Sequence, residues 1–380
     1  MALFFTISAY WSVIRLIKSS KYSNFQMPKI SIIIPMYNTE KYIQQCLESL
    51  LNQNFQQYEV IIIDDCSADK STKIVEKMAP KFNSLQLIKR SKNSAAPGIL
   101  RNIGIGLAKG KYLLFMDSDD VITKTALEEL YRAAEDSQAD VIHEEKFLIT
   151  KDRSEELTNK TQLIPISWER KDENGFVTKN TTISEDMSDR LQRYSQGQFY
   201  WNTWSKLFKR EFIIKNHILF PDLFSAEDMI FCFKCLCLAK NYVRVPNVVY
   251  FYRIRQGSIA HHDRQMEDHI QRQVKIIIDG SKCLNDFMKE FEIFDLQPEF
   301  RQNVLDIFIR EHFRHLRHIY ANTPVHEINE ILYKEFLTSS NVDASLISYF
   351  FSEANLFRVL FEQAQHQIAQ LQEELANLRN

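Results

Sequence analysis

The feature that most constrains this sequence is a regular alternation of short apolar runs and amphipathic segments between residues 30 and 142. The apolar runs favour buried strands and lie at 30–34, 58–63, 85–88, 111–116 and 139–142, and the first of them is strongly β-branched. Helical spacing occupies the segments between them, at 39–51, 71–78, 98–109 and 123–136. Strands that are apolar throughout and alternate with helices predict an α/β fold with a mainly parallel sheet.

Polar residues follow three of these predicted strands directly, as PMYN at 35–38, DDCS at 64–67 and DSDD at 117–120. Ligands bind at the carboxyl ends of the strands in such sheets. We therefore expect one crevice to collect Tyr37, Asp64, Asp65, Asp117, Asp119 and Asp120. Carboxylates gathered in this way repel one another unless a cation joins them, and oxygen ligands favour Mg²⁺ or Mn²⁺. A single acidic pair after a strand is equally a helix cap, so the argument depends on the three strand ends together.

Glycine is scarce, with 8 in 380 residues, yet Gly98, Gly104, Gly106 and Gly110 lie close together. We expect the backbone there to use the conformational freedom of glycine. The chain has no P-loop motif, and Gly104 and Gly106 lie inside a predicted helix, so a dinucleotide fingerprint is also excluded. The formal net charge is −2, which gives no basic excess, so nucleic acid is not an expected partner.

The first 27 residues show apolar side chains at spacings of four and three, which predicts an amphipathic helix over 1–27. The uncharged stretch 1–14 is too short to span a bilayer, which needs about 20 residues. No basic region precedes this stretch and no cleavage site follows it, so we do not expect a secretory signal. The helix either packs on the protein's own core or lies on a membrane surface. We therefore expect a cytoplasmic protein, with peripheral contact at the inner face of the cell membrane as one possibility.

The second part of the chain has little strand signal, and we expect a helical domain over 263–350 followed by a coiled-coil-like helix over 351–380. The heptad seam of that helix consists of Phe357, Phe361, Ala364, Ile368, Leu371, Leu375 and Leu378. The seam is narrow and the other faces are polar, which favours a homo-oligomer over docking on the chain's own helical domain.

Several motifs, in a fixed order, resemble the family-2 inverting glycosyltransferases with the GT-A (Rossmann-like) fold. They are PKISIIIPMYN at 28–38, IIDDCS at 62–67, APGILRNIG at 96–104, FMDSDD at 115–120, SAED at 225–228 and YFYRIRQGS at 250–258. The resemblance places a GT-A domain over 28–262. Within the family, APG…RN and SAED are similar to bacterial enzymes that decorate cell-wall or surface polymers.

The resemblance implies a nucleotide-sugar donor, usually linked to UDP. The residues that would bind it are Pro35, Tyr37, Asn38, Asp64, Asp65, Arg101, Asn102, Asp117 and Ser118. Pro35 and Tyr37 match positions that hold the uridine, and Asp65 matches the carboxylate that reads the uracil ring. Asp117-Ser-Asp119 matches the Asp-x-Asp motif, in which one carboxylate faces the ribose and another the metal on the diphosphate. Asp119 is the expected Mn²⁺ or Mg²⁺ ligand, and Asp120 is a second candidate.

The resemblance also implies that Asp228 is the catalytic base, with Glu227 beside it. A divalent cation would neutralise the departing diphosphate, and a carboxylate would take the proton of the acceptor hydroxyl. One base and an in-line displacement invert the anomeric centre. We expect the N-terminus of the following helix to keep Asp228 ionised. The alternative is that the two acidic residues only cap that helix.

Further candidates are weaker. Trp201 and Trp204 could shape an acceptor site, or they could be core residues. Arg253 and Arg255 share one face of a predicted strand and could reach the phosphates or the acceptor, or form surface ion pairs. His261 could be a late metal ligand, or part of a polar loop.

The sequence thus predicts a metal-dependent inverting glycosyltransferase. It would move a sugar from a UDP-sugar to a hydroxyl of a bacterial surface glycan or polymer of the capsule, lipopolysaccharide or teichoic-acid type. One alternative is a catalytically silent GT-A scaffold that acts through its oligomerising tail. Another is a nucleotidyltransferase, although the glycine-rich phosphate loop of that class is missing after the first predicted strand.

Overall fold

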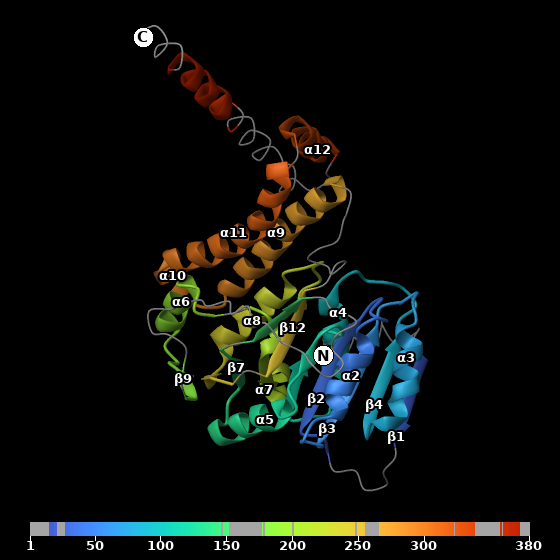
Figure 1. Cartoon of the computed structure of the whole chain (residues 1–380). Helices are drawn as coiled ribbons and strands as arrows, with labels where there is room; N and C mark the ends of the chain where they lie inside the picture. Colours follow the sequence, from blue (N-terminus) through green and yellow to red (C-terminus); the bar gives the residue numbers. More distant parts are fainter. Residues whose placement is uncertain are drawn as a thin grey trace. The chain divides into compact units, whose positions relative to one another are not determined.

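The computed structural model describes residues 15–20, 27–145, 147–151, 177, 179–199, 201–247, 249–254, 266–322, 324–338, 358 and 360–372. Its larger sheet has nine strands in the order β1-β4-β3-β2-β5-β10-β7-β11-β9, and Figure 1 labels β1, β4, β3, β2, β7 and β9 among them. The predicted strands are β2 (Ile30–Met36), β3 (Tyr58–Asp64), β4 (Ser84–Lys89), β5 (Tyr112–Phe115) and β7 (Val141–Glu144). Their existence and approximate bounds are confirmed.

The sheet is parallel in one half and mixed in the other. Strands β4, β3, β2 and β5 are parallel neighbours, as predicted. Strand β10 (Lys206–Lys209) lies between β5 and β7 and is antiparallel to both. Strand β11 (Tyr242–Val245) is parallel to β7, and β9 (Thr181–Ile183) closes this edge antiparallel to β11. The parallel half brings the carboxyl ends of β2, β3 and β5, each of which is followed by polar residues, to one edge of the sheet.

Helices cover both faces of the sheet. One hydrophobic cluster joins alternate strand residues such as Ile32, Ile34 and Ile62 to α2 (Ile43–Leu51), α3 (Ser71–Met78) and α5 (Ala126–Ser137). On the other face lie α4 (Pro97–Leu107) and α8 (Glu227–Leu238). There the ring of Phe115 contacts Phe220 and Phe231 edge-on, with ring centroids 5.2 Å and 5.7 Å away.

The clustered glycines have a packing role. A Cβ at Gly104 would lie 2.3 Å from Cγ2 of Ile33, and one at Gly110 would lie 2.6 Å from the backbone nitrogen of Ser31. A Cβ at Gly98 would lie 2.9 Å from Cγ of Glu227. Gly98 and Gly104 are ordinary helical residues of α4, so the expectation that backbone freedom requires glycine there is wrong. Glycine is needed at these positions because α4 approaches the sheet and α8 closely.

The N-terminal helix predicted over 1–27 is corrected at 15–20. Arg15–Ser20 form strand β1, which runs antiparallel to β4 with Arg15 opposite Lys89 and Ser20 opposite Ser84. An unpaired edge at β4 would leave a row of backbone donors and acceptors open, and β1 satisfies them. Backbone pairing thus outweighs the helical spacing of the side chains. Residues 1–14 and 21–26 lie outside the described residues.

A second, three-stranded sheet consists of β6 (Val121–Ile122), β12 (Tyr250–Ile254) and β8 (Leu148–Lys151). Strand β12 is antiparallel to β6 and parallel to β8. Trp204 stacks on Tyr250 and Tyr252 with centroids 4.5 Å and 5.5 Å away. This aromatic stack belongs to the same hydrophobic cluster as the large sheet.

The chain divides into two compact units, Met1–His262 with Phe287–Arg301, and Asp263–Asp286 with Gln302–Asn380. The first unit also contains α6 (Met187–Ser195), α7 (Arg210–Lys215) and α10 (Ile293–Leu296). Helices α9 (Met266–Met288), α11 (Pro298–Asn322) and α12 (Val325–Thr338) confirm the helical character predicted after 263. Residues 360–372 are helical and exposed throughout. Among the described residues, no helix combines the length and the apolar character that crossing a bilayer requires.

Candidate active site

The loops that follow β2 and β3 hold each other by hydrogen bonds. The backbone N–H of Asn38 donates to Oγ of Ser67 (2.9 Å), and Oδ1 of Asn38 accepts from the backbone N–H of Ala68 (2.9 Å). Tyr37 stands beside this contact with 49% of its surface exposed. An exposed tyrosine ring can stack on a flat ring, and the uridine-binding role of Pro35 and Tyr37 stays a prediction.

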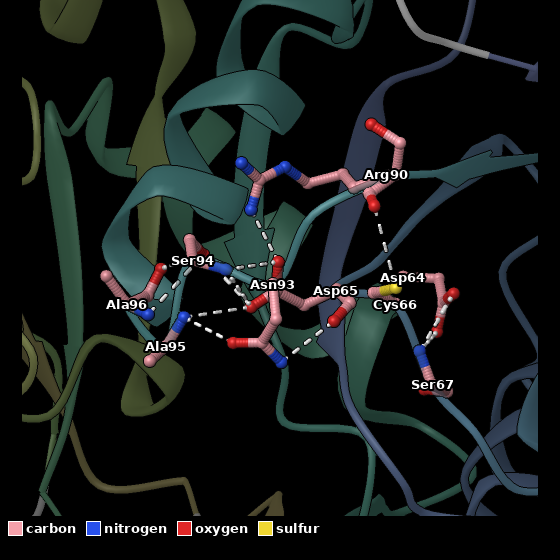
Figure 2. A network of polar contacts seen from close by, with 10 residues as sticks. Asp64, Asp65, Cys66, Ser67, Arg90, Asn93, Ser94, Ala95 and Ala96 are labelled. Atoms are coloured by element: carbon pink, nitrogen blue, oxygen red, sulfur yellow. Dashed lines mark hydrogen bonds and ion pairs between the residues drawn. The ribbon is translucent and has the colours of Figure 1, made fainter.

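Asp65 is the centre of a polar network at the end of β3 (Figure 2). Its carboxylate accepts from the backbone N–H of Ser94 (3.0 Å), from that of Ala95 (3.2 Å) and from Oγ of Ser94 (3.0 Å), and it pairs with Arg90. The backbone C=O of Asp65 accepts from the side chain of Asn93 (2.9 Å). Asp65 therefore fixes the loop 93–95, and its contact with a uracil ring stays a prediction.

Asp64 has a different environment from Asp65. Both of its carboxylate oxygens accept from the backbone N–H of Ser67 at 3.3 Å. Burial raises the pKa of Asp64, while the hydrogen bonds from Ser67 oppose the shift. Asp64 thus shapes the turn that presents Ser67 to Asn38, and a direct contact with the donor stays a prediction.

The loop 117–120, here called the aspartate loop, follows β5. The carboxylate of Asp117 pairs with Arg101 (3.0 Å), and Ser118 is buried. Both oxygens of Asp120 accept hydrogen bonds, from the hydroxyl of Tyr250 (2.7 Å) and the backbone N–H of Arg253 (2.8 Å). Burial and the charges of Asp119 and Asp117 raise the pKa of Asp120 well above its usual value. These contacts assign Asp120 a positioning role, and the metal-ligand prediction stays with Asp119.

Arg101 on α4 joins the aspartate loop to the N-terminus of α8. Its Nη1 donates to Oε1 of Glu227 (2.6 Å) and its Nη2 to Oδ1 of Asp117 (3.0 Å), and all of these side chains except that of Asp117 are buried. The guanidinium also lies over the ring of Phe220, 5.4 Å from its centroid. Burial lowers the pKa of Arg101, but the two carboxylates outweigh burial and hold it above its usual value.

Glu227 and Asp228 begin helix α8, directly after Ala226, whose φ of 69° is left-handed. Burial, followed by the charge of Asp228, raises the pKa of Glu227 to about 7. Burial also raises the pKa of Asp228, against Arg101 and the backbone N–H of Met229, which donates to it at 2.8 Å. Burial thus opposes the ionisation of Asp228 while the first-turn N–H of Met229 favours it, and the ionised state of Asp228 stays a prediction. The N-cap position is Ala226, which has no side-chain hydrogen bond, while Asp228 accepts from a first-turn N–H, so the capping alternative stays open beside the catalytic one.

Left-handed residues are concentrated at this edge of the sheet. Among the described residues, Asn38 (φ 49°), Cys66 (69°), Ala95 (54°) and Ala226 (69°) all lie in the loops just described. Such conformations cost a non-glycine residue on the order of 1–3 kcal/mol each and persist where the surroundings hold them. Their concentration here supports a functional site.

Three predicted site residues have partners within the protein. The side-chain amide of Asn102 donates to the backbone C=O of Phe220 (2.9 Å) and accepts from its N–H (3.0 Å), so it anchors the chain before α8, and its contact with a nucleotide stays a prediction. Trp204 is 9% exposed inside its aromatic stack, which agrees with the alternative of a core residue. Arg253 is buried at 3% exposure, so it is not part of a surface ion pair, and its contact with the acceptor or the phosphates stays a prediction. Trp201 is half-buried, while Arg255 and His261 lie outside the described residues.

Comparison with known proteins gives the family. Residues 31–213 match the family described as Glycosyl transferase family 2. The chain contains a domain of that family. It is 29% identical over 288 residues to a poly(ribitol-phosphate) beta-glucosyltransferase of Bacillus spizizenii, which covers 75% of this chain and 40% of that protein. It is 30% identical over 241 residues to the poly(ribitol-phosphate) beta-N-acetylglucosaminyltransferase TarP of Staphylococcus aureus, covering 62% of this chain and 66% of that one. The chain thus spans about two fifths of the first relative and two thirds of the second.

The fold is shared with a solved structure. The crystal structure of Staphylococcus aureus TarS 1–349 in complex with UDP-GlcNAc aligns with a TM-score of 0.56 at 22% identity, covering 87% of this chain and 92% of that chain. This shows the GT-A fold that the motifs indicated.

Several residues that build the site of this glycosyltransferase family 2 domain escaped the sequence analysis. They are Arg90, Asn93 and Ser94, which hold Asp65, and Gln45 and Tyr250, which contact the aspartate loop or its neighbours. A polar loop between a strand and a glycine-rich helix start was the available signal for 90–94. Tyr250 begins the motif YFYRIRQGS, which gave no role for its hydroxyl, and nothing local marks Gln45, because the partners of the two residues lie 130 and 208 residues away in the sequence.

Proposed function

We propose that this chain is a metal-dependent, inverting glycosyltransferase that transfers a sugar from a UDP-sugar to a hydroxyl of a bacterial cell-surface polymer. The observation that carries the proposal is the double ion pair of Arg101. It joins Glu227, next to the proposed base, to Asp117 in the loop proposed to face the donor. Arg101 thus ties the loop that would face the donor to the helix start that carries the proposed base, and a displacement between donor and acceptor requires these two parts to be held in a fixed relation.

The loops at the strand ends supply the donor site. Tyr37 and the network around Asp65 would hold the uridine, and the aspartate loop would face the diphosphate. Asp228, half-buried at the start of α8, would take the proton of the acceptor hydroxyl as that oxygen bonds to the anomeric carbon. The bond from that carbon to the diphosphate oxygen breaks in the same displacement, so UDP leaves with its electrons and the centre inverts.

The aspartate loop fits a divalent cation. Mutual repulsion among its carboxylates contributes to the raised pKa of Asp120, and a bound cation would relieve that repulsion. No three acidic, histidine or cysteine side chains within the described ranges converge into a complete ligand set. Mg²⁺ and Mn²⁺ commonly combine one or two carboxylates with phosphate oxygens and water, and Asp119 would be the protein's ligand. Such an ion would neutralise the leaving diphosphate.

The relatives guide the choice of acceptor. Two of them are named as poly(ribitol-phosphate) glycosyltransferases, so a polyol-phosphate polymer of the teichoic-acid type is the acceptor we propose first. UDP-glucose and UDP-GlcNAc are the corresponding donors to test.

The test is transfer of radiolabelled sugar from each UDP-sugar to poly(ribitol phosphate), with Mn²⁺ and with excess EDTA. We expect polymer labelling that stops in EDTA and in the Asp228→Asn variant. Full labelling in EDTA would contradict the metal role. Absence of transfer and of UDP release from every donor would favour a silent scaffold, and release of pyrophosphate from a nucleoside triphosphate would favour a nucleotidyltransferase.

A further inference from the structure

Strand β12 holds the aspartate loop at three of its residues. The hydroxyl of Tyr250 donates to Oδ2 of Asp120 (2.7 Å) and accepts from the backbone N–H of Asp117 (3.1 Å). The backbone N–H of Arg253 donates to Oδ1 of Asp120 (2.8 Å), and Nε of Arg253 donates to the backbone C=O of Asp119 (2.8 Å). One strand thus contacts the beginning, the middle and the end of the loop.

Arg253 is fixed on its other side by helix α2. Its Nη2 donates to Oε1 of Gln45 (2.8 Å), and its guanidinium lies over the ring of Tyr42, 5.1 Å from the centroid. A buried guanidinium with partners on two elements has few alternative positions. The C=O of Asp119 therefore has a fixed donor, which also limits how the backbone at Asp119 can turn.

The start of β12 is anchored independently. Oε1 of Glu144 accepts from the backbone N–H of Val249 (2.5 Å) and of Tyr250 (3.1 Å). The ring of Tyr250 is also stacked on Trp204 at 4.5 Å. The hydroxyl that bridges Asp117 and Asp120 is thus placed by both the backbone and the ring of Tyr250.

We propose that Tyr250 and Arg253 are positioning residues that orient Asp119 for a divalent cation and the donor diphosphate. This inference rests on the proposed function. Both residues lie beyond 213, outside the matched family region. Because both ends of the aspartate loop are held, the carboxylate of Asp119 is kept in one orientation. Less conformational entropy is then lost when a cation binds. The role of Arg253 is then to hold the loop, with no contact to the acceptor.

The first experiment measures metal affinity without turnover. Stabilisation of the chain by UDP is followed by thermal unfolding over a series of Mn²⁺ concentrations, and free Mn²⁺ is measured by electron paramagnetic resonance. Tyr250→Phe removes one hydroxyl and keeps the stacked ring. We expect the Mn²⁺ midpoint to rise about tenfold, while UDP binding in EDTA stays unchanged.

The matched control is Tyr58→Phe. Its hydroxyl donates a hydrogen bond of the same length, 2.7 Å, to the backbone C=O of Leu50, away from the aspartate loop. This variant loses a buried hydroxyl contact as Tyr250→Phe does, but we expect its Mn²⁺ midpoint to match the wild type. A midpoint for Tyr250→Phe equal to that of Tyr58→Phe would overturn the proposal.

Arg253→Lys tests the second residue, because lysine cannot form the contacts to Asp119 and Gln45 together. We expect the same rise in the Mn²⁺ midpoint. If Arg253 bound the diphosphate itself, this variant would weaken UDP binding equally in EDTA, and that result would overturn the positioning role. Failure of the proposed function gives a different result, which appears in the wild type itself. UDP would then not stabilise the wild type at any Mn²⁺ concentration, and both the proposed function and the positioning role would be overturned.

Discussion

Arg101 has a fork geometry that no other cationic side chain offers, and the site uses both of its arms. Glu227 and Asp117 lie 126 and 16 residues from it in the sequence. Breaking a buried ion pair by removing one partner costs about 3–5 kcal/mol, because the other charge stays buried. The same geometry leaves Asp228 outside the pairs formed by Arg101, which suits a group that must accept a proton.

We expect Arg101→Lys to lower kcat about tenfold to a hundredfold, which corresponds to about 1.4–3 kcal/mol of transition-state stabilisation. Lysine can keep one carboxylate partner at most, so Glu227 or Asp117 loses its contact. The measurement is sugar transfer at saturating UDP-sugar. Arg193→Lys is the control, since Arg193 forms a half-buried pair with Asp189 (2.9 Å) within α6, away from the aspartate loop. An unchanged kcat in Arg101→Lys would contradict the bridging role.

The pH dependence of kcat tests the carboxylate pair. Burial raises the pKa values of Glu227, to about 7, and of Asp228, so the base is protonated at low pH and kcat should rise as pH increases towards neutrality. In Glu227→Gln one negative charge disappears and Arg101 becomes available to Asp228. Both effects favour the ionised base, so we expect the acidic limb of the kcat profile to move to lower pH.

Stability gives a second measurement on the same variant. The folded-state pKa of Glu227 is raised, so the stabilising protonated form is lost as pH rises from about 4.5 to about 7. The thermal stability of Glu227→Gln relative to the wild type should therefore increase as pH rises from about 4.5 to about 7, starting from a deficit set by the lost contact with Arg101. The exposed Glu211→Gln is the control. If the acidic limb of the kcat profile and the pH dependence of stability in Glu227→Gln both match those of the wild type, the raised pKa of Glu227 is contradicted.

At the scale of elements, α4 gives a test in which packing and helix propensity act in opposite directions. Alanine is favoured over glycine in a helix by about 1 kcal/mol. A Cβ at Gly104 would nevertheless overlap Ile33, and overpacking of this kind costs about 1–3 kcal/mol. We expect Gly104→Ala to lower the free energy of unfolding measured in denaturant.

Gly106 is the matched control, since it lies in the same helix and is exposed. Gly106→Ala should raise the free energy of unfolding by up to about 1 kcal/mol. Adding Ile33→Ala should remove the overlap and restore part of what Gly104→Ala loses. If Gly104→Ala and Gly106→Ala change the free energy of unfolding in the same direction, close approach to β2 does not explain the glycine at position 104.

Strands β2 and β3 could be predicted because their β-branched runs are long and buried on both faces, and β5 because its run is apolar throughout and directly precedes an acidic cluster. Strands β10 and β11 have four residues each and gave no comparable signal. The carboxylates at the strand ends were predictable too, because parallel strands bring their carboxyl ends together. The partners of those carboxylates were not, since contacts such as Asp120 with Tyr250 depend on how distant elements pack. For β1, side-chain periodicity gave the wrong element because an open sheet edge was invisible in the sequence.

At the scale of the whole molecule, the helix at 360–372 has an apolar seam that is exposed, and no other described residue packs over it. Phe361, Ile368 and Leu371 are 64%, 54% and 63% exposed. The heptad spacing favours a second copy of the same helix as the partner. We expect multi-angle light scattering to give the mass of a dimer or a trimer for the full chain.

The variants that test this seam differ only in the helix face they change. Ile368→Lys with Leu371→Lys should reduce the mass to that of one chain. Gln367→Lys with Gln370→Lys adds the same charge off the seam and should leave the oligomer intact. Thermal unfolding of the first unit should be the same in both. A single-chain mass for the wild type would end the self-association proposal.

The contacts between β12 and the aspartate loop have a consequence for protein synthesis. Asp120 and Arg253 are separated by 133 residues, and a ribosome adds about 5–20 residues per second, so the loop is made on the order of ten seconds before the strand that holds it. On the positioning proposal, a nascent chain that has completed the matched family region 31–213 still lacks an ordered metal site. Translation that stops between 213 and 250 would release a recognisable family domain that binds donor poorly. Co-translational folding thus places the onset of activity after Arg253 has left the exit tunnel.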